Sequence, residues 1–319
     1  MASAYTQSQI SAYLSHIEIP PKYHLSANPP RDAAFLKALH IHTISTLPYE
    51  NLSLHYNATH RNSLDPQDLY RKIVENNRGR GGYCMENSIF FNHILRGLGF
   101  LVYTAGVRIR LRENGVPGGD YVGWVHIVNI VTIDGQKYMV DVGFGGDGAT
   151  RPIPLIPNSP VKNLGTQEIQ LVRDHIPSQT HRVEDTQLWI YQYRNGEHLP
   201  WNSFYAFPDF EFMEADFKIM NWFTGSSPEA HQTYNVIAVK FLRKKLEGED
   251  EVIYGKRMML NGTVKENLGG KTVIVQECTT EVERVAALRQ WFGITLSEEE
   301  KVGIIGHVTE LKRATANTR

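Results

Sequence analysis

The stretch Arg80-Gly81-Gly82-Tyr83-Cys84-Met85-Glu86-Asn87 places a cysteine directly after a glycine-rich loop and at the predicted start of a helix. Phe91, Leu95 and Leu98 follow at helical spacing, so the helix is expected to be buried. The first turn of a helix carries unpaired N–H groups and a partial positive charge, which favour a thiolate over a thiol. The position therefore indicates a cysteine nucleophile, because a structural cysteine gains nothing from it.

Length and composition set the broad class of protein. The chain has 319 residues, of which 41% are hydrophobic and 21% charged, as expected of a globular enzyme with two or three domains. The net charge of -1 and the lack of a basic block argue against nucleic acid or an anionic membrane as partner. Two cysteines, Cys84 and Cys278, do not make a disulfide framework. The N-terminus is polar, so we expect a cytoplasmic protein without a signal peptide.

The pattern of predicted elements divides the chain into three parts. The first part, residues 1–99, is helical and carries the nucleophile. The second part, residues 100–205, reads as strands and turns, and the stretch 152–163 is the expected long loop. The third part, residues 206–319, is mixed, with helices predicted over 210–222 and after the capping residues Thr280 and Ser297. The fold class is therefore α+β.

A hairpin in the second part brings a histidine and an aspartate together. Predicted strands over 122–133 and 137–143 flank Asp134-Gly135, a strong signal for a two-residue turn. With that turn Ile133 lies opposite Gln136, and His126 and Asp141 become diagonal neighbours on one face, ~7–8 Å apart at Cα. A three-residue turn would place them on opposite faces.

Both side chains lie in otherwise apolar strands, where an unpaired charge is costly. Taken alone, either one is more often a structural residue of a sheet than a catalyst. Together with Cys84 they form the nucleophile, base and orienting acid of a thiol enzyme, so Cys84, His126 and Asp141 are the predicted catalytic residues. The other histidines, His42, His93 and His231 among them, are interpreted as without a catalytic role, and no metal site is predicted because no cluster has metal-ligand spacing.

Four motifs resemble those of the arylamine N-acetyltransferase family. Residues 80–87 resemble its active-site signature, and Pro48-Tyr49-Glu50-Asn51-Leu52 resembles an upstream element in which this chain has Tyr for Phe. The segments around His126 and over 140–145 resemble the motifs of its base and acid, and the order and spacing of all four agree. After Gly145 the likeness weakens, although 220–228 is similar to a later segment of the family that faces coenzyme A.

The resemblance implies an architecture and a reaction. The three parts would be a helical domain, a β-barrel and an α/β lid around a papain-like thiol-enzyme core. Cys84 would take an acetyl group from acetyl-CoA as a thioester and pass it to an arylamine or arylhydrazine by ping-pong transfer, a step of xenobiotic metabolism. Val122 and Gly123, with Phe223 and Ser227, would contact coenzyme A. The acceptor site would be formed by Tyr49, Val125 and Phe144.

Some residues depart from the family pattern and leave the substrates open. Tyr49 adds a hydroxyl to the acceptor site, and Glu229-Ala230-His231-Gln232 is less apolar than the family's later segment. A malonyl-CoA donor is an alternative that would need a cation or hydroxyl near the thioester, such as Arg80 or Tyr49. Transglutaminase-like or protease-like thiol enzymes, which act on polypeptides, are the alternative class. A catalytically idle scaffold is a third hypothesis.

Overall fold

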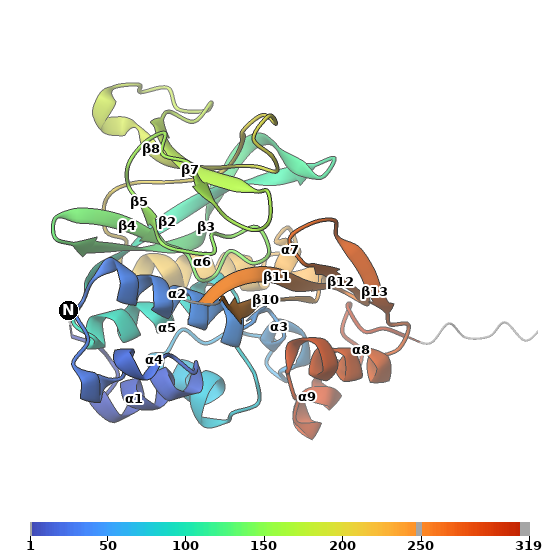
Figure 1. Ribbon diagram of the computed structural model, residues 1–319. Coiled ribbons are helices and arrows are strands. Elements are labelled where there is room, and N and C mark those ends of the chain that lie inside the picture. The colour runs from blue at the N-terminus through green and yellow to red at the C-terminus, as the bar shows by residue number, and fades with distance from the viewer. Residues whose placement is uncertain (1, 247–250, 313–319) are drawn as a thin grey trace, which may run out of the picture.

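The computed structural model describes residues 2–246 and 251–312. Helices of the N-terminal third lie on one side, a large curled sheet covers them, and a smaller sheet with the C-terminal helices completes the molecule (Figure 1). The predicted α+β class is confirmed. Within the described residues, no helix is both long and apolar enough to cross a membrane.

The N-terminal third is helical, as predicted. The Asp65 carboxylate caps α4 by accepting hydrogen bonds from the backbone N–H groups of Gln67 and Asp68, at 2.9 and 3.2 Å. The helix α5 begins at Cys84 itself and buries most of its length in the main core. The α-helices here are α1 (Gln7–His16), α2 (Ala33–Thr46), α3 (Ser53–Tyr56), α4 (Pro66–Tyr70) and α5 (Cys84–Gly97), with 3-10 turns at Pro21–Tyr23 and Leu25–Ala27 and a π-turn at Arg71–Glu75.

The middle of the chain forms an antiparallel sheet of eight strands in the order β5-β4-β3-β2-β9-β8-β7-β6. The strands are β2 (Leu101–Glu113), β3 (Val116–Ile133), β4 (Gln136–Val140), β5 (Ile153–Pro154), β6 (Val161–Lys162), β7 (Glu168–Asp174), β8 (Leu188–Arg194) and β9 (Asn202–Phe207), with a 3-10 turn at Glu184–Thr186. Strand β9 was not predicted, and the expected long loop over 152–163 contains the two short strands β5 and β6.

The predicted hairpin register is confirmed. Ile133 pairs with Gln136 across the two-residue turn, and the ladder runs to Asn129 opposite Val140. Asp134 and Gly135 both have positive φ, as this type of turn requires. The Asn129 amide donates to the carbonyl of Ser88 at 3.0 Å and its oxygen accepts from Asn92 at 2.8 Å. These buried bonds hold β3 against α5. They therefore fix the position of His126, on β3, relative to Cys84 at the start of α5.

The C-terminal third contains a second sheet, in the order β1-β10-β11-β12-β13. Its first strand, β1 (Tyr49–Glu50), comes from the N-terminal third and pairs with β10, so the Pro48-Tyr49-Glu50-Asn51 element belongs to this sheet. The remaining elements are α6 (Glu214–Ser226), α7 (His231–Tyr234), β10 (Ile237–Lys245), β11 (Glu251–Leu260), β12 (Thr263–Asn267), β13 (Val273–Glu277), α8 (Glu281–Ala287), a π-turn at Leu288–Phe292, and α9 (Glu298–Gly303).

Candidate active site

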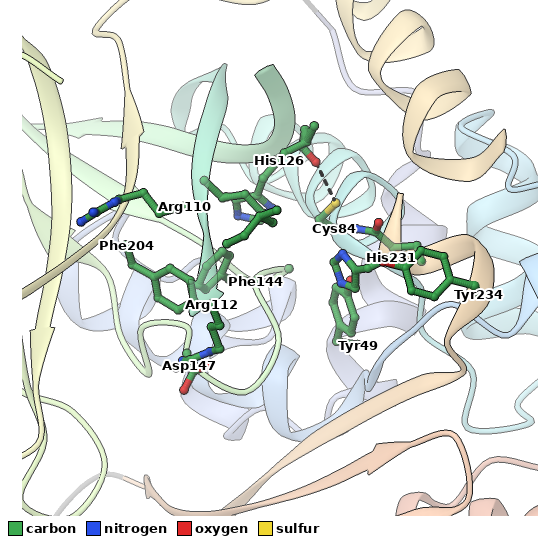
Figure 2. A pocket seen from close by; sticks show the side chains of 15 residues that line it. Tyr49, Cys84, Arg110, Arg112, His126, Phe144, Asp147, Phe204, His231 and Tyr234 are labelled. Carbon is green, nitrogen blue, oxygen red and sulfur yellow. Dashed lines mark hydrogen bonds and ion pairs between the residues drawn. The ribbon is translucent and has the colours of Figure 1, made fainter. Parts of the chain in front are cut away.

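Cys84 and His126 line one cavity of about 360 Å³ between the two sheets. Cys84 lies at the first position of α5, and its Sγ is 3.9 Å from the carbonyl oxygen of Val125, the neighbour of His126 (Figure 2). Gly143, after strand β4, passes so close that a Cβ there would lie 2.8 Å from the Cys84 backbone. Only glycine permits this approach, which brings the end of the hairpin onto the start of α5.

The histidine and aspartate form the predicted pair. The His126 Nε2 lies 2.9 Å from the Asp141 Oδ2, and both side chains are buried. The other carboxylate oxygen of Asp141 accepts a hydrogen bond from the backbone N–H of Gly143 at 3.0 Å. Asp141 thus fixes the imidazole from one side, and Nδ1 is the ring nitrogen that a thiol can use as a base.

Opposing effects act on the pKa of the Cys84 thiol. Burial raises the pKa of Cys84 well above its ordinary value, and the carboxylate of Asp141 raises it further. The backbone N–H groups at the start of α5 lower the pKa, as predicted, but burial outweighs them. Because burial opposes the charged form, forming the nucleophile here needs a base inside the cavity.

A buried group of charges supports the loop in front of Cys84. The Arg80 Nε donates to the Glu50 carboxylate at 2.9 Å, and Lys72 lies 2.7 Å from Glu86. Burial raises the pKa of Glu50, but Arg80 and Lys72 outweigh it and lower the value to about 2. Glu300, in the C-terminal tail, also pairs with Arg80. A residue near the C-terminus, in α9, therefore contributes to the support of this loop.

The predicted acceptor residues Tyr49, Val125 and Phe144 all line the cavity of Cys84. The Phe144 ring lies 5.0 Å from the His126 ring and packs at 4.8 Å against Phe204. An aromatic substrate would therefore meet ring faces and edges beside the predicted base.

A second cavity, of about 530 Å³, adjoins the first and contains three of the four predicted coenzyme residues. Val122 and Gly123 on β3 face Phe223 on α6 across it. A Cβ at Gly123 would meet no atom within 4 Å, so this glycine relieves no crowding and borders open space. Ser227 does not line either of the two cavities, and its hydroxyl accepts from the backbone N–H of Glu229 at 3.3 Å.

The sequence missed the short helix α7 as part of the site. His231, interpreted as without a role, lines both cavities together with Gln232 and Tyr234. The buried Asn51 holds α7 in place, because its amide donates to the carbonyls of Gln232 and Asn235 at 2.9 and 2.7 Å. Two signals in the sequence pointed here: the likeness of 220–228 to a coenzyme-facing segment that ends just before α7, and Asn51 of the upstream motif, whose partners lie in a distant segment.

Comparison with known proteins agrees with this geometry. The family model described as N-acetyltransferase matches residues 32–302. The N-malonyltransferase FDB2 of Fusarium pseudograminearum is 32% identical to the chain, over 94% of this chain and 92% of the relative. The arylamine N-acetyltransferase of Escherichia coli is 28% identical, over 65% of this chain and 66% of the relative.

Solved structures share the fold. The arylamine N-acetyltransferase of Salmonella typhimurium superimposes with a TM-score of 0.75 at 22% identity, covering 94% of this chain and 99% of that chain. The Mycobacterium marinum arylamine N-acetyltransferase in complex with CoA has a TM-score of 0.71 at 20% identity, and the match covers 95% of this chain and 99% of that chain.

Proposed function

This chain belongs to the arylamine N-acetyltransferase family, and from that premise we propose that Cys84 carries an acyl group from a coenzyme A thioester to a small aromatic amine. Family membership makes it an acyl-CoA-dependent N-acyltransferase. The observation that carries the specific proposal is the shared cavity in which a helix-starting thiol meets a buried His–Asp pair. The family match favours this reaction over a thiol enzyme that acts on polypeptides.

In the first half-reaction, His126 takes the proton of Cys84 and the thiolate attacks the thioester carbonyl. The bond from that carbon to the Cys84 sulfur forms, the bond to the coenzyme A sulfur breaks, and the proton passes from His126 to the departing thiolate. Asp141 stabilises the imidazolium that exists between these transfers, since it holds the ring through a 2.9 Å hydrogen bond.

In the second half-reaction, the amine attacks the thioester on Cys84 and His126 takes a proton from the attacking nitrogen. The carbon–sulfur bond breaks, the amide leaves, and the proton returns to the thiol. Tyr49, Val125 and Phe144 would hold the ring of the amine. Val122, Gly123 and Phe223 would hold the pantetheine arm of the donor, because they line the adjoining cavity.

Two acyl groups are candidates. Acetyl follows from the family's description as N-acetyltransferase. Malonyl is the second candidate, because relatives 31–32% identical over more than nine-tenths of this chain are named N-malonyltransferases.

The proposal is tested by mixing the protein with acetyl-CoA or malonyl-CoA without an amine and recording the intact mass. One acyl group should be added and mapped to Cys84, and a simple aromatic amine such as aniline should then remove it as the amide. No adduct with either donor, or an adduct on Cys278 and not on Cys84, would falsify the proposal.

A further inference from the structure

The cavity around Cys84 has two chemically different sides. The first, called here the sheet side, is lined by His126 and Phe144, and includes Asp141, which bonds to His126 without lining the cavity. The second, called the α7 side, consists of Tyr49, His231 and Gln232. Figure 2 shows Tyr49 and His231 beside Cys84, away from Arg110, Phe204 and Asp147. Polar groups on the α7 side are not needed for an acetyl group, which presents only a methyl beyond its carbonyl.

His231 is a half-buried ring, and within residues 2–246 and 251–312 its side chain makes no ion pair or hydrogen bond, although Glu229 also lines the second cavity. Burial alone acts on its pKa and lowers it, so no carboxylate compensates the loss of water. Gln232 is buried beside it and interacts with the hydroxyl of Tyr49. The Tyr49 hydroxyl in turn is close enough to Cys84 for a thiolate there to raise its pKa. These three groups therefore surround the space next to the sulfur.

We propose that His231, together with Gln232 and Tyr49, receives a carboxylate carried by the acyl group on Cys84, so that the donor is a malonyl-type coenzyme A thioester. This inference rests on the proposed acyl transfer through Cys84. The imidazole would donate a hydrogen bond to the carboxylate, or pair with it as imidazolium, and the amide of Gln232 and the hydroxyl of Tyr49 are further donors. The relatives named N-malonyltransferases agree with a donor of this chemistry.

The arginine side chains nearest this site already bind other groups of the protein. Arg80 does not line the cavity of Cys84 and pairs with Glu50 and Glu300 behind the loop. Arg112 pairs with Asp147 at 2.5 Å and stacks on Phe204 at 4.8 Å. Arg110 donates to the carbonyl of Gly119 at 2.9 Å and extends away from Cys84 (Figure 2).

A malonyl group on Cys84 would place its carboxylate within reach of the α7 side. Its carboxylate is separated from the thioester carbon by a single methylene group, so it stays close to the sulfur. Acylation itself proceeds as for acetyl: the bond to Cys84 forms, the bond to the coenzyme sulfur breaks, and His126 returns the proton to the departing thiolate. The carboxylate takes no part in these bond changes, so His231 acts on donor selectivity and not on the chemistry.

The test compares the kcat/KM for acylation of Cys84 by malonyl-CoA with that by acetyl-CoA. Samples are quenched at successive times, and the intact mass of the protein gives the acylated fraction in each. The parent should accept malonyl-CoA. His231→Phe keeps an aromatic ring but removes both nitrogens, and should lower the malonyl-to-acetyl ratio by about tenfold or more. His231→Gln keeps a donor and should give an intermediate ratio. His181→Phe, the same change in an exposed loop, should leave the ratio at the parent value.

An unchanged ratio in His231→Phe, with both donors still acylating Cys84, would overturn the inference and leave the proposed function standing. A parent that accepts acetyl-CoA and rejects malonyl-CoA would also overturn it. Failure of both donors in the parent would instead remove the proposed function on which the inference rests. Circular dichroism of each variant identifies a loss of fold, and Gln232→Leu then provides a second reading of the ratio.

Discussion

The sheet side and the α7 side both face Cys84, but the chain holds them in different ways. On the sheet side, 15 residues separate His126 from Asp141, and the ladder of one hairpin sets their distance. On the α7 side, Asn51 bonds to carbonyls 181 and 184 residues further along the chain. The first arrangement is local, whereas the second exists only in the folded molecule.

The difference separates chemistry from selectivity. The groups proposed to move protons belong to the locally determined side, where a change of register would move His126 and Asp141 to opposite faces. The groups proposed to choose the acyl donor lie on the short helix α7 and on strand β1, outside the β3–β4 ladder, so their side chains can change without disturbing that register. We infer that substrate range can vary within this fold while the acyl-transfer step is kept.

The largest effect should come from Cys84, which both sides face. Cys84→Ser should abolish turnover of an acyl-CoA and an aromatic amine, because a hydroxyl has a far higher pKa and is a weaker nucleophile. Product formation measured by chromatography checks this, and Cys278→Ser, a buried thiol elsewhere, should retain activity. Substantial amide formation by Cys84→Ser would contradict the assignment.

The next effect should come from the sheet side. Asp141→Asn preserves the shape of the side chain but removes the charge that supports the imidazolium, so kcat/KM should fall by about 10²- to 10⁴-fold. Because burial raises the pKa of Cys84, alkylation by iodoacetamide near neutral pH depends on His126 as base and should slow as well. An alkylation rate equal to that of the parent across the pH range would show that the aspartate does not act through His126.

The same contrast explains what the sequence could predict. The hairpin, its two-residue turn and the His126–Asp141 contact followed from Asp134-Gly135 and the alternation around it, since these are short-range constraints. Strand β1 and helix α7 did not follow, because each is too short for periodicity and depends on a distant partner. His231 was overlooked for this reason. At Cys84 the sequence indicated the helix terminus, which lowers the pKa of the thiol, but not the depth of burial, which raises it.

A smaller effect is expected when the α7 side loses its anchor. Asn51→Ala leaves the carbonyls of Gln232 and Asn235 and the N–H of Ile237 without their buried partner. The free energy of unfolding should fall by ~3 kcal/mol, since an unpaired buried polar group costs roughly 1–3 kcal/mol. Urea denaturation measures this change.

The exposed Asn76→Ala is the matched control for this variant and should change the stability little. Alkylation of Cys84 should slow less in Asn51→Ala than in Asp141→Asn, because the hairpin is untouched. Equal slowing in both variants would mean that the two sides of the cavity are not independent.

The smallest effect is expected at Gly123, which borders the second cavity. Gly123→Val adds a branched side chain where a Cβ meets no atom within 4 Å, so it should cost little stability and instead fill space in that cavity. If the pantetheine arm runs there, the KM for the acyl-CoA should rise by about tenfold, or ~1.4 kcal/mol, while the KM for the amine changes much less. Gly270→Val, at an exposed glycine that also borders open space, is the control and should change neither constant. Equal changes in both KM values for Gly123→Val would place its effect in the cavity of Cys84 and remove Gly123 from the donor site.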